Sequence, residues 1–247
     1  MKILGIIPAR YASTRFPGKP LAMINGKTMI QRVYEQAKKC SSLENVIVAT
    51  DDDAIFKHVE SFGGNVVMTS ESHPSGTDRI AEVVEILNND GEHYDAIINI
   101  QGDEPYIDPK QIELIAQLFE DPDVVLGTLI KQINTIEELN NSNVVKVVKD
   151  LNDFAVYFSR YSIPFCRNEK EDEEKLKSHS YYKHIGIYGY KSDVLRQITK
   201  LNMSSLEKSE SLEQLRWLEN GFKIKVAITD IEGHAVDTYD DLLKLVK

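Results

Sequence analysis

Four short runs are apolar at nearly every position, and they constrain the fold more than any other feature of the sequence. They lie at residues 3–7, 46–49, 96–100 and 124–126. A strand with one face in solvent alternates apolar and polar residues, so an unbroken apolar run indicates a strand that is buried on both faces. These runs therefore predict a central, mostly parallel sheet that is flanked by helices.

Segments with helical periodicity separate these strands. Residues 80–87 and 112–119 each place four apolar side chains at i, i+3, i+4 and i+7, which puts them on one face of a helix. The alternation of strand and helix predicts an α/β fold in which ligands bind at the carboxyl ends of the strands. A chain of 247 residues is long enough for one well-packed core, so we expect a single domain over 1–247.

The pattern changes after about residue 131. Shorter apolar stretches at 144–148, 154–158 and 185–190 predict the strands of a sheet extension or arm, which we place at about residues 132–200. Residues 169–177 are almost entirely charged, which is typical of a solvated loop.

The last part of the chain returns to longer elements. We expect a helix over 209–220, a strand over 224–228 and a terminal helix that begins near Thr238. Thr238 and Asp241 have the spacing of a capping box, which favours a helix start at this point.

The acidic composition limits the partners. Lysine and arginine total 29 against 39 aspartates and glutamates, a net charge of −10, whereas a nucleic-acid surface needs a basic face. The two cysteines, Cys40 and Cys166, have no spacing that suggests a disulfide framework or a zinc site.

The first apolar run is far shorter than the roughly 20 residues of a membrane span. We therefore expect no nucleic acid polymer, no membrane insertion and a cytoplasmic location.

The densest cluster of candidate binding residues is the segment 8–20, directly after the first predicted strand. It holds three cations, Arg10, Arg15 and Lys19, beside hydroxyls and on a backbone stiffened by three prolines. Guanidinium and ammonium groups make charge-assisted hydrogen bonds to phosphate oxygens, so this loop favours a polyphosphate ligand. The alternative is a surface loop whose arginines pair with nearby carboxylates.

Two nearby patterns are misleading. Gly26-Lys27-Thr28 resembles the end of a Walker A motif, but that motif needs a glycine where this chain has Leu21, so we interpret Gly26-Lys27 as a turn before a helix. Asp51-Asp52-Asp53 resembles a metal site, yet it lies between a strand and a helix, where N-capping explains it.

A pair of separated carboxylates is the candidate metal site. Asp103 follows the predicted strand at 96–100, within Gln101-Gly102-Asp103-Glu104-Pro105, and Asp237 precedes the terminal helix. Mg²⁺ bound to phosphates often uses only one or two protein carboxylates. The two residues form one site only if the fold returns the C-terminus to this edge of the sheet; otherwise Asp103 is a turn former and Asp237 a capping residue.

A further set of polar residues suits a sugar acid. An arginine can bind a substrate carboxylate in a bidentate manner, and the other side chains can bind hydroxyls. The set comprises Arg160, His184, Tyr188, Glu213 and Gln214. Taken singly, His184 and Tyr188 are better explained as structural residues and Glu213 as an exposed carboxylate of a helix. Ser75-Gly76-Thr77-Asp78-Arg79 either contacts a base or phosphate through its amides or only caps the helix that follows.

Six motifs in this order resemble the 3-deoxy-manno-octulosonate cytidylyltransferases, and the resemblance spans the whole chain. The segment 7–20 by itself would indicate only a broader nucleotidyltransferase. The six motifs are the segments 7–20, 75–79, 101–105, 157–160, 183–190 and 212–216.

This resemblance implies a nucleotide-diphospho-sugar transferase-like fold with a Rossmann-like sheet and a β-rich dimerisation arm, in a homodimer. It implies Mg²⁺-dependent transfer of CMP from CTP to the acid sugar Kdo (3-deoxy-D-manno-octulosonate) for lipopolysaccharide synthesis. It also implies roles for particular residues. Arg10, Ser13, Arg15 and Lys19 would bind the CTP phosphates, Gln101 would lie near the nucleotide, and Ser75, Gly76, Thr77 and Arg79 would contribute to the cytidine pocket.

The same resemblance places Asp103 and Asp237 on magnesium and makes them, with Lys19, the catalytic residues. Arg160, His184, Tyr188, Glu213 and Gln214 would bind the sugar. The alternatives are another CMP-acid-sugar synthetase, acting on sialic acid or on a Kdo analogue such as the 8-amino sugar, and a non-catalytic nucleotide-binding module. A glycosyltransferase is a weaker third alternative.

Overall fold

The computed structural model describes residues 1–12, 16–169 and 171–246, and its contacts group into two compact units. Unit 1 comprises Met1–Ala116, Ile187–Thr199 and Gly233–Lys247, and unit 2 comprises Gln117–Gly186 and Lys200–Glu232. Within unit 1, segments from both ends of the chain pack together. The single domain and the arm over 132–200 stay predictions; residues 132–186 of that arm belong to unit 2 and residues 187–199 to unit 1.

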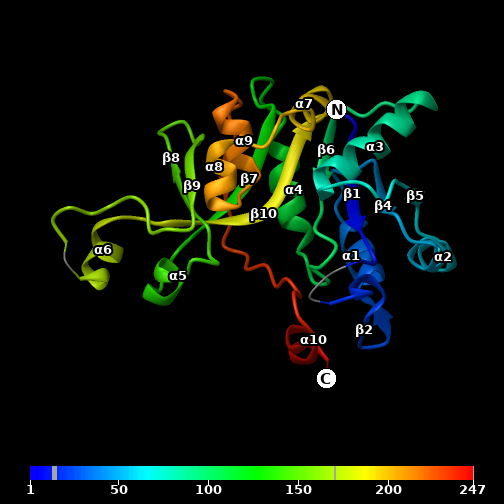
Figure 1. The fold of residues 1–247 in the computed structure, drawn as a ribbon, viewed down its shortest axis with the longest axis horizontal. Helices are drawn as coiled ribbons and strands as arrows, with labels where there is room; N and C mark the ends of the chain where they lie inside the picture. The colour runs from blue at the N-terminus through cyan, green and yellow to red at the C-terminus, as the bar shows by residue number, and fades with distance from the viewer. Residues whose placement is uncertain (13–15, 170, 247) are drawn as a thin grey trace. The chain divides into compact units, whose positions relative to one another are not determined.

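Unit 1 is an α/β layer structure around a mostly parallel sheet (Figure 1). The strand order is β10-β6-β1-β4-β5, in which β6, β1, β4 and β5 are parallel and β10 is antiparallel to β6. The strands of unit 1 are β1 (Ile3–Ala9), β2 (Met23–Ile24), β3 (Lys27–Thr28), β4 (Asn45–Thr50), β5 (Val66–Met68), β6 (Ala96–Asn99) and the end of β10 (Tyr182–Lys191). The helices are η1 (Lys19–Leu21), α1 (Met29–Ala37), α2 (Asp53–Ser61), α3 (Gly76–Asn89), α4 (Pro109–Leu118), whose last two residues belong to unit 2, α7 (Ser192–Ile198) and α10 (Tyr239–Leu245).

The apolar runs form the strands that the sequence predicts. β6 is buried at every position, β1 at all but Pro8 and β4 at all but its first residue, so both faces of this sheet are covered. Helices α1 and α3 pack on β1 and β4. The predicted strands at 3–7, 46–49 and 96–100 and the helices around 80–87 and 112–119 are confirmed as β1, β4, β6, α3 and α4. The run at 124–126 only begins a strand, because β7 covers Leu126–Gln132.

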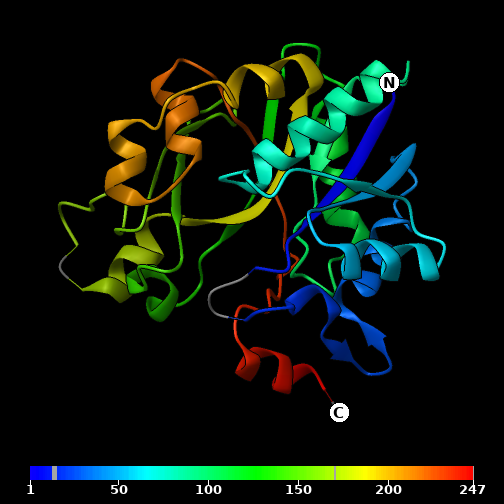
Figure 2. The ribbon, with the colours of Figure 1, turned by 45° about the vertical axis from the view of Figure 1, so that its right-hand side comes forward.

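The C-terminal helix packs against the start of the chain in unit 1. Leu242 of α10 is buried in a cluster with Val236, Ile24 and Met29, and Figure 2 shows the red helix next to the blue N-terminal elements. Thr238 and Asp241 form the predicted capping box. The predicted turn at Gly26-Lys27 is confirmed in the β2–β3 hairpin, which leads into α1.

Unit 2 has strands that belong to one connected sheet, in which β7 lies between β11 and β10, and four short helices among its described residues. β11 pairs in parallel with β7, and β8 pairs antiparallel with both β9 and the start of β10. The elements are β7, α5 (Ile136–Asn140), β8 (Lys146–Lys149), β9 (Ala155–Ser159), α6 (Asp172–Ser178), α8 (Ser205–Glu210), α9 (Gln214–Glu219) and β11 (Lys225–Ile228). The predicted strands at 144–148, 154–158, 185–190 and 224–228 are confirmed.

Two predictions in unit 2 are wrong in part. None of residues 169 and 171–177 is buried, but this charged segment contains the helix α6. The first turn of α6 carries three acidic residues and its last turn two lysines. This order of charges favours a helix, because it complements the helix dipole. The predicted helix over 209–220 is divided into α8 and α9 by Ser211, which adopts a left-handed conformation.

We expect Leu242→Ala to lower the free energy of unfolding by about 2–4 kcal/mol, because it leaves a cavity in the cluster that holds α10. Urea denaturation measures the change. The matched control is Leu243→Ala in the same helix, where the side chain is 53% exposed and we expect a change within about 0.5 kcal/mol. Equal effects of the two substitutions would contradict the packing role of Leu242.

Candidate active site

A cavity of about 260 Å³ lies in unit 1, at the carboxyl ends of β1 and β6. Its wall is built from the loop after β1, the loop after β6, the start of α3 and the segment that precedes α10. Parallel strands end at the same edge of a sheet, where loops with polar side chains converge. The cavity therefore lies at the position that the strand pattern predicts.

Eight of the predicted site residues line this cavity: Arg10, Lys19, Ser75, Gly76, Arg79, Gln101, Asp103 and Asp237. Thr77 is buried and is not among the lining residues. Ser13 and Arg15 lie outside the described residues.

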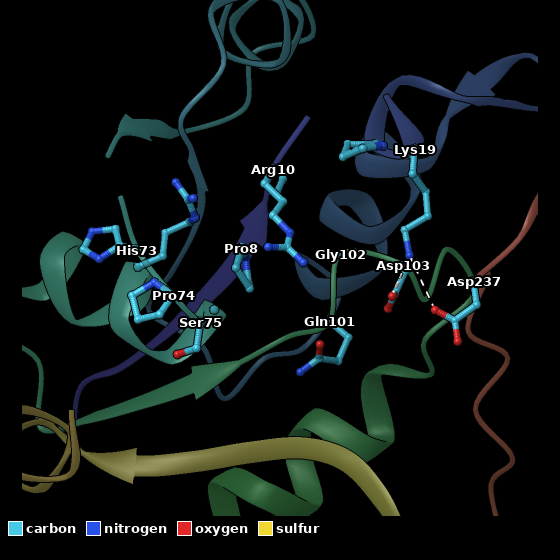
Figure 3. A pocket seen from close by; sticks show the side chains of 14 residues that line it. Pro8, Arg10, Lys19, His73, Pro74, Ser75, Gln101, Gly102, Asp103 and Asp237 are labelled. Atoms are coloured by element: carbon cyan, nitrogen blue, oxygen red, sulfur yellow. Dashed lines mark hydrogen bonds and ion pairs between the residues drawn. The ribbon is translucent and has the colours of Figure 1, made fainter. Parts of the chain in front are cut away.

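Lys19 joins the two predicted metal ligands. Its Nζ donates to Asp103 Oδ2 at 2.8 Å and to the carbonyl oxygen of Val236 at 2.9 Å, and it lies 3.9 Å from Asp237 Oδ1. The backbone amide of Val236 in turn donates to the carbonyl oxygen of Asp103. Figure 3 shows both carboxylates directed toward the Lys19 ammonium. The C-terminus therefore returns to the sheet edge, which was the condition for one acidic site.

Arg10 is exposed and lines the same cavity, and within the described residues its guanidinium has no ion-pair partner. The two described cations of the 8–20 segment thus differ. Lys19 pairs with carboxylates, which is the behaviour that the surface-loop alternative predicted for the arginines. Arg10 keeps its hydrogen-bond donors available to an anionic ligand.

Gly102 allows the loop after β6 to pass close to the end of β1. A methyl group at this position would lie 2.6 Å from the carbonyl oxygen of Pro8, a backbone atom that cannot move without displacing β1. The absence of a side chain at Gly102 therefore determines how closely Asp103 approaches the loop that carries Arg10.

Arg79 is buried beneath the cavity, and its guanidinium is held on two sides. Nη2 donates to Asp51 Oδ2 at 2.5 Å and Nη1 to Thr69 Oγ1 at 2.5 Å. The capping interpretation of 51–53 is confirmed for Asp52, whose carboxylate accepts from Ala54 and Ile55 amides. Asp51 has a different role, since its carboxylate fixes the orientation of Arg79.

The segment that ends at Ser75 contributes residues that the sequence predictions did not include. His73 and Pro74 line the cavity beside Ser75, whose hydroxyl also caps α3 by accepting from the Asp78 amide. Figure 3 shows these three residues on one side of Pro8 and Arg10, with Lys19, Asp103 and Asp237 on the other. The available signal was their place between a strand and a predicted helix cap.

Glu104, beside Asp103, is a second residue that was not predicted. Its carboxylate lies against Gly233, where an added methyl would come within 3.1 Å of Oε2. Burial and the neighbouring Asp103 carboxylate raise the pKa of Glu104 to about 7. This acid is therefore partly protonated at neutral pH and contributes less than a full negative charge near the site.

The predicted sugar-binding residues are distributed over both units. Arg160, in unit 2, donates from Nε to the carbonyl oxygen of Glu210, from Nη1 to Ser142 and from Nη2 to Ser211. It lines a separate cavity of about 220 Å³ in unit 2. Its position is thus fixed by backbone carbonyls, and its guanidinium forms no ion pair within the described part of the chain.

His184 is half-buried in unit 2, with Nε2 3.0 Å from Thr128 Oγ1 and its ring edge-on to Phe158. Burial lowers the pKa of His184 to about 4, so the imidazole is neutral near pH 7. Gln214 is buried and begins α9 directly after Glu213. Tyr188 belongs to unit 1, where it stacks on Tyr190 and pairs with Asn99 of β6.

The unit 1 cavity thus combines an exposed arginine, two carboxylates on one lysine and an uncharged stretch of wall at Pro74 and Ser75. Cations and a nearby acidic pair suit a polyanion with an accompanying divalent cation. Within the described residues, no group of three or more histidine, cysteine or acidic side chains forms a protein-only metal cage. None of the described helices has the length and apolar character needed to cross a membrane.

Comparison with known proteins gives a consistent result over the full chain. The cytidylyltransferase family model matches residues 4–225. The 3-deoxy-manno-octulosonate cytidylyltransferase of Bacteroides thetaiotaomicron is 55% identical over 245 residues, which cover 98% of this chain and 96% of that protein.

Solved structures agree with this match. A structure of CMP:2-keto-3-deoxy-manno-octonic acid synthetase complexed with CTP has a TM-score of 0.90 and 41% identity, covering 99% of this chain and 96% of that one. The 4-diphosphocytidyl-2C-methyl-D-erythritol synthase of Anaerococcus prevotii, with a TM-score of 0.63 and 11% identity over 99% and 96% of the two chains, shares the fold.

We expect Gly102→Ala to displace the loop after β6, because its methyl group would meet the Pro8 carbonyl. The expected result is a lower melting temperature together with weaker nucleotide binding, measured by calorimetry. The control is Gly186→Ala, whose methyl group meets no atom within 4 Å and should leave the melting temperature nearly unchanged. Gly91→Ala would not serve, because Gly91 has a positive φ that strains any other residue. A fully stable Gly102→Ala protein would contradict the close approach.

The lowered pKa of His184 predicts a dependence of stability on pH. The unfolded state binds a proton near pH 6.5, but the folded state does so only near pH 4, so protonation favours unfolding. Between these values the free energy of unfolding should fall with falling pH, by on the order of 3 kcal/mol from this group. Denaturation from pH 7 to pH 4 measures the slope, and His184→Gln should reduce it; an unchanged slope would contradict the burial of a neutral imidazole.

Proposed function

The chain belongs to the 3-deoxy-manno-octulosonate cytidylyltransferase family, and from this premise we propose that it transfers CMP from CTP to the anomeric hydroxyl of Kdo and releases pyrophosphate. The observation that carries the proposal is the unit 1 cavity, where Lys19 contacts Asp103 and Asp237 and Arg10 lines the same wall at the strand ends. A triphosphate needs this combination of cations and metal-binding acids.

The two sides of the cavity suggest an orientation for CTP. The triphosphate would lie on the side of Lys19 and Asp103, where Arg10 and Lys19 line the cavity and would donate to it. Ser13 and Arg15 would also bind the phosphates, a role that the family resemblance implies. The cytidine would lie toward Ser75, Gly76, Thr77 and Arg79, with Gln101 near the nucleotide. The solved relative described above was complexed with CTP, which supports a nucleotide in this fold.

Asp103 and Asp237 fit a bound Mg²⁺. Both carboxylates line the cavity and both contact the Lys19 ammonium, so the pair already holds one positive charge. Hard carboxylate oxygens are the protein ligands that Mg²⁺ prefers beside phosphates. Mg²⁺ would supply charge neutralisation of the triphosphate, and Lys19 would then be available to donate to a phosphate oxygen.

The reaction we propose is an in-line displacement at the α-phosphorus of CTP. A bond forms from the anomeric oxygen of the sugar to this phosphorus, the bond to the β-phosphate oxygen breaks, and the hydroxyl proton is lost to solvent. Phosphoryl transfer of this kind depends mainly on positioning and charge neutralisation. Arg10 and Lys19 would therefore act as electrostatic catalysts, and we assign no general base.

Arg160, His184, Tyr188, Glu213 and Gln214 would bind the acid sugar. Arg160 suits the sugar carboxylate because backbone carbonyl groups position its guanidinium, which forms no ion pair with any carboxylate among the described residues. The neutral His184 suits hydroxyl groups, since it can donate or accept.

We further propose that the product serves lipopolysaccharide synthesis in the cytoplasm and that the protein acts as a homodimer through the segment 132–200. Tyr161 and Phe165 in this segment are 80% and 82% exposed, which supports burial against a second copy. Sedimentation of the purified protein measures its mass, and a monomer at micromolar concentration would contradict the dimer.

A pyrophosphate-release assay tests the function. We expect release with CTP and Kdo, and little release with UTP or with sialic acid in place of Kdo. Release with sialic acid or the 8-amino sugar alone would identify a related synthetase. Binding of CTP without any release would instead favour a non-catalytic nucleotide-binding module.

Asp103→Asn tests the metal assignment. We expect a folded protein whose turnover falls by roughly 100-fold or more, because one hard ligand beside the triphosphate is lost. Pyrophosphate release gives the rate and circular dichroism checks the fold. The matched control is Asp90→Asn at the exposed end of α3, which should keep full turnover; wild-type turnover of Asp103→Asn would refute the assignment.

A further inference from the structure

The segment Thr69–Ser75, between β5 and α3, forms one wall of the unit 1 cavity. Its last three residues, His73, Pro74 and Ser75, line the cavity directly. No regular hydrogen-bond ladder supports this segment, because β5 ends at Met68 and α3 begins at Gly76. The shape of the wall therefore depends on individual side-chain contacts.

Both ends of the segment are anchored. At the start, the amide and hydroxyl of Thr69 both donate to the carbonyl oxygen of Thr50, at 2.8 and 3.0 Å. At the other end, the Ser75 hydroxyl caps α3. These contacts place the two ends but leave the five residues 70–74 between them.

Glu82, in the second turn of α3, supports the interior of the segment. Its Oε2 accepts from the Ser70 amide at 2.8 Å and lies 2.5 Å from His73 Nε2. Residues 70–74 form hydrogen bonds to one residue outside the segment, Glu82, within the part of the chain that the structure describes. The geometry makes one carboxylate responsible for the position of His73 and its neighbours.

The charge state of Glu82 agrees with this geometry. Burial tends to raise the pKa of its carboxyl, but the hydrogen bonds from His73 and from the Ser70 amide outweigh burial, and the pKa lies below its ordinary value. Glu82 is therefore ionised at neutral pH, and hydrogen bonds to an ionised acceptor are the stronger kind.

We propose that Glu82 is a positioning residue for the nucleotide: it holds the Thr69–Ser75 segment through Ser70 and His73, so that the cavity wall is formed before CTP binds. The inference rests on the proposed function, since it names the nucleotide as the ligand of this wall. Preformed walls favour binding because the ligand then does not bear the entropy of ordering them.

The experiment compares Glu82→Ala and Glu82→Gln with Glu85→Gln, a control at an exposed position one turn along the same helix. Calorimetric titration with CTP, without sugar, gives Kd, and pyrophosphate release gives KM and kcat. We expect Glu82→Ala to weaken CTP binding about tenfold and to raise KM for CTP equally. We expect kcat at saturating CTP and KM for Kdo to stay within about twofold, because the lost contact affects ground-state binding.

Glu82→Gln keeps an acceptor for the Ser70 amide and should fold even where Glu82→Ala does not; its Kd for CTP should lie between those of wild type and alanine. A Kd equal to that of Glu85→Gln in a folded Glu82→Gln or Glu82→Ala protein overturns the proposal. So does a loss confined to kcat, because wall positioning acts on nucleotide binding.

His73→Ala completes a double-mutant cycle with Glu82→Ala. If Glu82 acts through His73, the double variant should bind CTP no more than about twofold weaker than Glu82→Ala. If the losses of CTP affinity in the two single variants add fully in the double variant, Glu82 does not act through His73. The function is tested separately, because wild-type protein that releases no pyrophosphate with CTP and Kdo refutes the activity, whereas CTP binding and its change in the Glu82 variants are measured without sugar.

Discussion

The ion pair between Lys19 and Asp103 is the interaction on which the site depends. It joins the loop after β1 to the loop after β6, and the same ammonium binds the Val236 carbonyl, which adds the C-terminal segment. Three stretches of chain far apart in sequence therefore meet at one nitrogen. Lys19 is largely shielded from solvent and Asp103 about one quarter exposed, so removing either charge would leave the other poorly compensated.

Around this pair, small and buried features set the geometry. Gly102 permits close approach to β1, and Asp51 fixes Arg79 beneath the cavity. The cluster of Leu242, Val236 and Ile24 keeps the C-terminal segment in place, so that Asp237 reaches Lys19. These contacts are apolar or internally satisfied, whereas Arg10 remains exposed to a ligand. The site thus consists of a rigid frame and a few groups that stay available for binding.

Much of the fold could be predicted from the sequence because burial leaves a periodic pattern. The runs that form β1, β4 and β6 and the faces of α3 and α4 were found in this way. Prediction was weaker where burial gives no pattern. Helix α6 has no buried residue, so its charges resembled a loop. Ser211 interrupts a helical stretch by its left-handed backbone conformation, which the identity of a serine does not predict.

The sequence by itself determined the chemistry that is available: a cluster of cations after the first strand, strand-end acids and an order of motifs that resembles one family. Residue types and local spacing contain this information. Only the tertiary structure decided which groups meet. It brought Asp237 near Asp103, which is more than half of the chain away in sequence, and placed His73 in the cavity wall. It also showed that Asp51, which the sequence suggested as a helix cap, is the partner of Arg79. Contacts between distant residues arise from packing of whole elements, and that packing is not encoded in any short segment.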